Sequence, residues 1–97
     1  MFTSKQRSHL KSIAANLEPI MQVGKEGITD NLVKSLSDAL EARELIKITI
    51  LESATDEPKA LAAELAAALN AEVVIVMGRK AVLYRYSKRN NFKHIEY

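Results

Sequence analysis

Cysteine is absent from the 97 residues of the sequence, which excludes disulfide bonds, a thiolate metal site and a cysteine nucleophile. This absence fits a reducing compartment. The apolar runs are short, such as residues 73–77, and none approaches the ~18 residues that a membrane-spanning helix needs. The first residues are not followed by an apolar stretch with a cleavage site, so the sequence shows no secretory signal. We therefore expect a cytoplasmic protein that does not enter a membrane.

Patterns that would support catalysis are also missing. The only two histidines, His9 and His94, do not have metal-ligand spacing with carboxylates. The serines do not lie in a G-x-S-x-G motif, and no G-K-[ST] follows the glycines as a P-loop requires. Nothing in the sequence groups a nucleophile, a base and a residue that orients them. The sequence therefore predicts a protein that is not an enzyme and holds no metal or cofactor.

No glycine- and serine-rich linker divides the chain, and its length suits one domain. Apolar residues make up 47% of the sequence and charged residues 27%, which is typical of a globular chain with a core. We predict a single domain over residues 1–97, in which residues 87–97 form a basic tail.

The order of the expected elements is α-β-α-β-α-β-β. Thr3 and Gln6 have the spacing of a capping box, Thr29 is a suitable N-cap, and the helix after Asp56 has proline in its first turn. Apolar spacing then predicts helices over about residues 4–16, 30–43 and 57–69, and strands over residues 20–23, 45–51, 72–77 and 81–86. Alternation of strands and helices implies parallel crossovers, and the last two strands form a hairpin. The expected fold class is α/β, with a mixed four-stranded sheet packed with helices, and the pattern leaves the strand order open.

The net charge of +2 conceals an uneven distribution. Residues 1–17 carry three basic residues and no acid, residues 18–77 carry five basic and eleven acidic residues, and residues 78–97 carry six basic residues and one acid. If the two ends meet in the fold, they form a basic surface suited to RNA, opposite an acidic side. Alternatively, the ends are charged only because they are solvated.

A glycine pair separates the first expected strand from the following helix. In Gly24-Lys25-Glu26-Gly27, the glycines allow a sharp turn and close approach of a ligand backbone. The amides that begin the next helix favour phosphate, and KH domains hold nucleic-acid backbone with a G-x-x-G loop. The alternative is that both glycines only close the turn.

A basic segment closes the patterned part of the chain, over residues 78–89. Arginine can bind phosphate in a bidentate manner, and a tyrosine such as Tyr84 can stack on a base. Alternatively, the segment is a basic edge strand that prevents aggregation, and Tyr84 belongs to the core. The basic first helix, the tail and the glycine pair form one patch if the fold brings them together.

Four runs in the sequence resemble the YhbY family, the bacterial stand-alone form of the CRM (chloroplast RNA splicing and ribosome maturation) domain. They are SKQRxxLK at residues 4–11, VGKEGIT at residues 23–29, ARELIKI at residues 42–48 and MGRKAVLYR at residues 77–85. The resemblance covers nearly the whole chain, in matching order and spacing. It implies a fold related to the C-terminal domain of bacterial translation initiation factor three.

The resemblance also implies an RNA-binding protein that associates with precursor RNA of the large ribosomal subunit, and we expect it to be a monomer. Contacts to phosphate and RNA shape are expected from the G-x-x-G loop and from basic residues. The predicted RNA-binding residues are Lys5, Arg7, Lys11, Gly24, Lys25, Gly27, Arg79, Lys80, Arg85, Lys88 and Arg89. The alternative is a protein-interaction module that docks a basic ribosomal protein through the acidic second helix, with Asp30, Asp38, Glu41 and Glu44.

Overall fold

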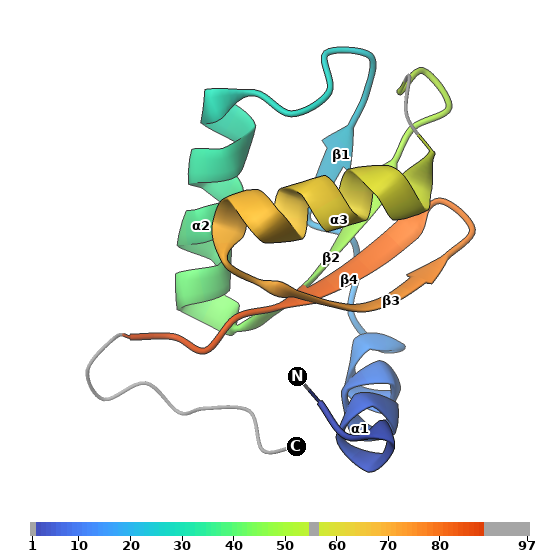
Figure 1. Ribbon diagram of the computed structural model, residues 1–97, viewed down its shortest axis with the longest axis vertical. Helices are drawn as coiled ribbons and strands as arrows, with labels where there is room; N and C mark the ends of the chain where they lie inside the picture. Colours follow the sequence, from blue (N-terminus) through green and yellow to red (C-terminus); the bar gives the residue numbers. More distant parts are fainter. Residues whose placement is uncertain (1, 55–56, 89–97) are drawn as a thin grey trace.

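A computed structural model describes residues 2–54 and 57–88 (Figure 1). The predicted element order and fold class are confirmed. The elements are α1 (Ser4–Ala14), β1 (Met21–Val23), α2 (Asp30–Arg43), β2 (Leu45–Ile50), α3 (Pro58–Leu69), β3 (Glu72–Met77) and β4 (Lys80–Tyr84).

Local signals at the helix starts explain most of these boundaries. The predicted capping box is present, because the Gln6 amide donates to Thr3 Oγ1 at 3.1 Å and the Thr3 amide donates to Gln6 Oε1 at 3.0 Å. Thr29 caps α2 by accepting from the Leu32 amide. At the start of α3, Glu57 is the N-cap residue without a side-chain bond. The predicted acidic cap Asp56 lies outside the described residues.

The sheet has the strand order β1-β2-β4-β3. β1 and β2 pair in parallel through α2, as the crossover prediction requires. β4 pairs antiparallel with both β2 and β3. The crossover through α3 therefore leaves a space between β2 and β3, and β4 fills it. For this reason the interpretation of residues 78–89 as an edge strand is wrong, because β4 is central and the edges are β1 and β3.

The two faces of the sheet have different cover. On one face, α2 and α3 enclose the larger core, whose sheet residues are Val23, Ile46, Ile48, Ile50, Ala81 and Leu83. On the other face, α1 encloses a smaller core through Leu10 and Ala14, against Leu45, Val74, Val82 and Tyr84. Successive residues of a strand point to opposite faces of the sheet. On this second face, α1 covers only part of the sheet and leaves the remaining strand side chains uncovered. We call this surface the open face, and it consists of Gln22, Lys47, Thr49, Met77 and Lys80.

Candidate nucleic-acid interface

The glycine loop, residues 24–27, is a tight turn between β1 and α2. The Gly27 amide donates to the Gly24 carbonyl oxygen at 2.9 Å, and Gly27 has a φ of +66°. A Cβ on Gly24 would lie 3.3 Å from Ser53 Oγ, whereas nothing lies within 4 Å of a Cβ on Gly27. Each glycine thus has a local reason, close packing for Gly24 and positive φ for Gly27. The loop presents the exposed Lys25 beside an open approach to the Gly27 backbone.

Three loops meet at this end of the sheet. The Leu51 amide donates to the Val23 carbonyl oxygen, and the Ile50 amide donates to the Arg79 carbonyl oxygen. The Arg79 guanidinium donates to the Leu51 carbonyl oxygen at 3.2 Å. The glycine loop, the segment after β2 and the β3–β4 turn are therefore held together, and Lys80 follows this turn as an exposed residue of β4.

The basic residues of α1 divide into exposed and internally bound groups. Lys5 and Lys11 are exposed. Arg7 is half-buried and donates to the carbonyl oxygens of Val73 at 2.8 Å and Val74 at 2.7 Å. These carbonyls lie where the register of β3 shifts, so Arg7 attaches α1 to an irregular sheet edge.

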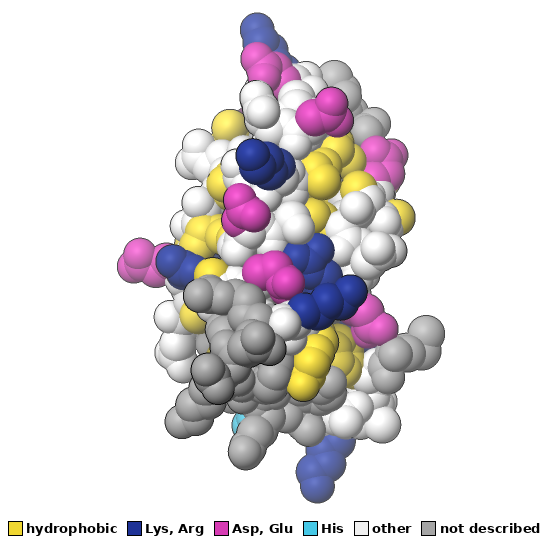
Figure 2. Space-filling view, turned by 90° about the vertical axis from the view of Figure 1, so that its left-hand side faces the viewer, with side chains coloured by type: hydrophobic (Ala, Val, Ile, Leu, Met, Phe, Trp, Pro, Cys, Tyr) yellow, Lys and Arg dark blue, Asp and Glu magenta, His cyan; other side chains and the backbone are white. Residues whose placement is uncertain are grey.

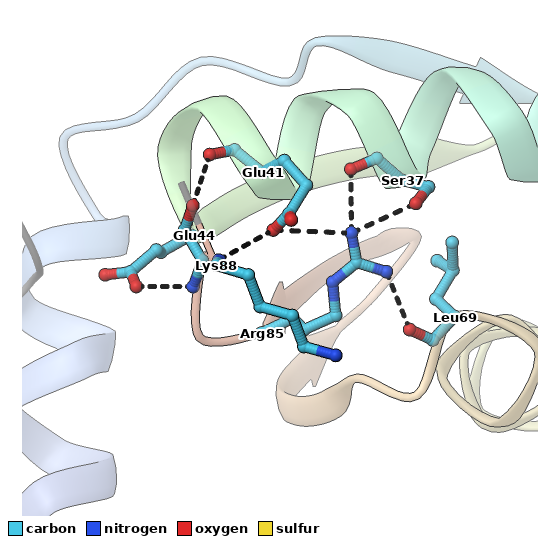
Figure 3. A network of polar contacts seen from close by, with 7 residues as sticks. Ser37, Glu41, Glu44, Leu69, Arg85 and Lys88 are labelled. Atoms are coloured by element: carbon cyan, nitrogen blue, oxygen red, sulfur yellow. Dashed lines mark hydrogen bonds and ion pairs between the residues drawn. The ribbon is translucent and has the colours of Figure 1, made fainter. Parts of the chain in front are cut away.

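Arg85 takes part in a polar network that joins α2, α3 and the segment after β4 (Figure 3). Its guanidinium donates to the Leu69 carbonyl oxygen at 2.9 Å, to the Ser37 carbonyl oxygen at 2.9 Å and to Ser37 Oγ at 3.0 Å. Glu41 Oε2 lies 3.8 Å from the same guanidinium. Like Arg7 and Arg79, Arg85 therefore donates its hydrogen bonds to carbonyl oxygens of the protein itself.

The same network engages part of the acidic helix. Glu44 is fully buried, and its carboxylate accepts from the Ser87 amide at 2.7 Å. Glu41 accepts from the Lys88 amide at 3.4 Å, and its carbonyl oxygen accepts from Ser87 Oγ. The proposed acidic docking surface therefore retains only Asp30 and Asp38 as exposed residues.

The charged side chains do not divide the molecule simply into a basic and an acidic side. Figure 2 shows acidic and basic side chains interspersed on the side formed by α2. The expectation of a uniformly acidic side is not met there. The open face, by contrast, carries Lys47 and Lys80, and the one acid of the described strands, Glu72, lies opposite Tyr84 at the other end of β3 from Met77.

The predicted residues form three groups in space. Gly24, Lys25, Gly27, Arg79 and Lys80 share the loop end of the sheet. The α1 group, Lys5, Arg7 and Lys11, lies at the opposite end of the long axis from the glycine loop (Figure 1), so the hypothesis of one compact patch is wrong for these two groups. Arg85 and Lys88 form a third group beside α2. Arg89 lies outside the described residues, as does the rest of the predicted tail from residue 89 onward.

Lys47 is absent from the predicted RNA-binding residues, yet it lies on the open face between the first two groups. Alternation along β2 correctly predicted that Lys47 points to the other face of the sheet from its neighbours Ile46 and Ile48. The pattern could not tell how little of that face α1 covers. The Lys47 ammonium donates to the Leu17 carbonyl oxygen at 3.1 Å, which leaves two of its three N–H donors for other partners.

The two tyrosines near β4 have different environments. Tyr84 is 4% exposed, and its ring meets the Phe2 ring edge-on with centroids 5.2 Å apart. Tyr84 is thus a core residue, and the alternative that placed it there is confirmed. Tyr86 is 57% exposed and is the tyrosine near β4 that a base could reach.

The described residues, 2–54 and 57–88, form neither a cluster of metal ligands nor a membrane-spanning helix. Among these residues, no group of three or more histidines, aspartates or glutamates is placed to hold a metal ion. None of the described helices is long and apolar enough to cross a membrane.

The sequence matches a known family over most of its length. The model of the CRS1 / YhbY (CRM) domain matches residues 2–85. The chain belongs to this CRM domain family.

Individual relatives match along most of their length. A Bacillus subtilis protein named "Probable RNA-binding protein YqeI" is 43% identical over 96 residues, which are 99% of this chain and 98% of the relative. A Pseudomonas aeruginosa protein, also named a probable RNA-binding protein, is 33% identical over 89 residues, 92% of this chain and 86% of the relative. The solution structure of a Staphylococcus aureus protein has a TM-score of 0.78 and 46% identity, and covers 94% of this chain and 95% of its own.

Proposed function

We propose that this protein binds RNA, and that its target is precursor RNA of the large ribosomal subunit during ribosome assembly. The observation that carries the proposal is the glycine loop of a CRM domain, with exposed Lys25 beside the accessible Gly27 backbone. Relatives at 43% and 33% identity are named RNA-binding proteins, which supports the same class of ligand.

The contacts follow from the exposed charges. Lys25 and Lys80 flank the loop end of the sheet, and Lys5 and Lys11 extend the positive surface at α1. Lysine meets phosphate as a point charge, so the expected recognition is of the backbone and its shape, not of base sequence. Of the four arginines in the predicted set, Arg7 and Arg79 support this surface by fixing α1 and the β3–β4 turn, and Arg85 joins α2 to α3.

A monomer in the cytoplasm is the form that we propose for binding. The edge strand β1 has only three residues. The other edge strand, β3, is irregular between Val73 and Ile75, and Arg7 occupies two of its carbonyl oxygens. Short or irregular edges oppose pairing of the sheet with a second copy.

Crosslinking in cells, followed by sequencing of the bound RNA, tests the proposal. We expect enrichment of large-subunit precursor RNA over other RNA of similar abundance. The double variant Lys25→Glu/Lys80→Glu should lose most crosslinks, because two positive charges at the loop end become negative.

The matched control is Lys34→Glu/Lys59→Glu, which makes the same change of net charge at exposed positions of α2 and α3. Equal loss in both double variants would attribute binding to net charge alone and contradict the assigned surface. Crosslinks to RNA other than ribosomal precursors would contradict the assembly role while retaining RNA binding.

A further inference from the structure

A groove runs between α1 and the open face. Its wall on α1 consists of Ser8, Lys11, Ser12, Ala14 and Ala15, and its floor on the sheet consists of Lys47, Ile75, Met77 and Val82. The lining is mostly apolar, yet two lysines stand on opposite sides of it and no acidic residue contributes. We call it the α1 groove.

We propose that the α1 groove binds one unpaired RNA base. This inference rests on the proposed RNA-binding function and adds to it a selectivity for RNA with an unstacked nucleotide. The base would lie against Ile75 and Met77, and its phosphates would meet Lys11 and Lys47.

The chemistry of the lining favours this occupant. A nucleotide combines an apolar base face with charged phosphates, and the groove combines apolar side chains of the sheet with one lysine from α1 and one from β2. Met77 is 60% exposed, and a thioether makes favourable contacts with aromatic rings. An apolar segment of a protein would use the floor but would leave the two ammonium groups without an anionic partner.

The register of the sheet connects the groove to the glycine loop. Met77 lies opposite Lys80, Lys80 opposite Thr49, and Thr49 opposite Gln22 in neighbouring strands. Gln22 is two residues before Gly24. This row of side chains crosses three strand spacings, roughly 14 Å, so one RNA can follow it from the loop to the groove.

The test compares two RNA hairpins of the same stem sequence, one with a single bulged 2-aminopurine and one fully paired. The wild-type protein should bind the bulged hairpin about fivefold to tenfold more tightly, because burial of one base against the apolar side chains of the groove is favourable. The fluorescence of 2-aminopurine should change on binding, because the base enters an apolar site.

Two variants place a carboxylate in the groove from opposite walls, Ala15→Glu on α1 and Met77→Glu on β3. Both residues are exposed, so the fold should persist. Each variant should lose the preference for the bulged hairpin and bind the paired hairpin within about threefold of the wild type, because the loop end is unchanged. The control Ala63→Glu adds the same charge at an exposed position of α3 and should keep the preference.

The outcomes separate this inference from the proposed function. Equal wild-type affinity for the two hairpins, or a preference that persists in both groove variants, overturns the groove assignment while RNA binding stands. If the preference persists in both groove variants, the groove binds either a protein or no ligand. Failure of the wild type to bind either hairpin overturns the proposed function and this inference together.

Discussion

The two faces of the sheet are built from the same strands but differ in cover and in charge. One face lies under α2 and α3 and consists of buried aliphatic residues such as Ile48 and Leu83. The other is covered by α1 over only part of its area and carries Lys47 and Lys80. The two faces show how a small domain combines a complete core with a partly uncovered polar surface, since alternation assigns each strand residue to one face or the other.

Substitution of adjacent residues in β2 should give the largest contrast between the faces. Ile48 is fully buried, and Ile48→Ala should lower the free energy of unfolding by about 3 kcal/mol, because it removes apolar contacts and leaves a cavity. Thr49 lies on the open face, and Thr49→Ala should cost less than about 1 kcal/mol. Urea unfolding measures both. Similar losses in the two variants would mean that the open face is packed in solution.

Arginine and lysine residues provide a second, smaller contrast. Arg85→Gln should lower the free energy of unfolding by about 2 kcal/mol, because carbonyl oxygens of Leu69 and Ser37 lose a charged donor. Lys80→Gln removes an exposed charge and should change stability by less than about 0.5 kcal/mol. Thermal or urea unfolding provides the measurement. A stable Arg85→Gln protein with weakened RNA binding would return Arg85 to the group of RNA contacts.

The smallest expected effect is on the salt dependence of RNA affinity. If about five phosphates are neutralised, a slope near −0.7 per phosphate predicts roughly a hundredfold loss of affinity between 50 and 200 mM salt. Lys80→Gln should reduce the slope of log affinity against log salt by about 0.7, the share of one phosphate. Lys34→Gln, an exposed lysine of α2, is the matched control and should leave the slope unchanged. The prediction fails if the two slopes change equally in titrations of single-stranded or hairpin RNA.

Local patterns in the sequence predicted the elements closely. The predicted strand over residues 72–77 coincides with β3, and the predicted helix from its N-cap Thr29 to about residue 43 coincides with α2. The first helix ends at Ala14 instead of residue 16, where a tighter turn begins through the bond from the Leu17 amide to the Ala14 carbonyl oxygen. These features depend on caps, apolar spacing and alternation, all of which are visible within a few residues.

Long-range partners decided what the sequence could not predict. Arg7 binds carbonyls 66 and 67 positions away, and Arg85 binds Ser37 across 48 positions. A count of basic residues treats these arginines like the exposed Lys25, although their charges meet the protein itself. The strand order was likewise beyond local pattern, and with it the central position of β4. The strand order is needed to know which polar strand residues α1 leaves uncovered on the open face.

The central position of β4 has a consequence for synthesis of the protein. The chain leaves the ribosome from its N-terminus, so β4 becomes available after β1, β2 and β3, although it lies between β2 and β3. Until residue 84 has emerged, β3 has no neighbour to pair with, and Lys47 and Met77 cannot share a surface. A nascent or truncated chain therefore holds all of the earlier strands but none of the α1 groove. Because of this strand order, the α1 groove forms only in a chain that includes β4.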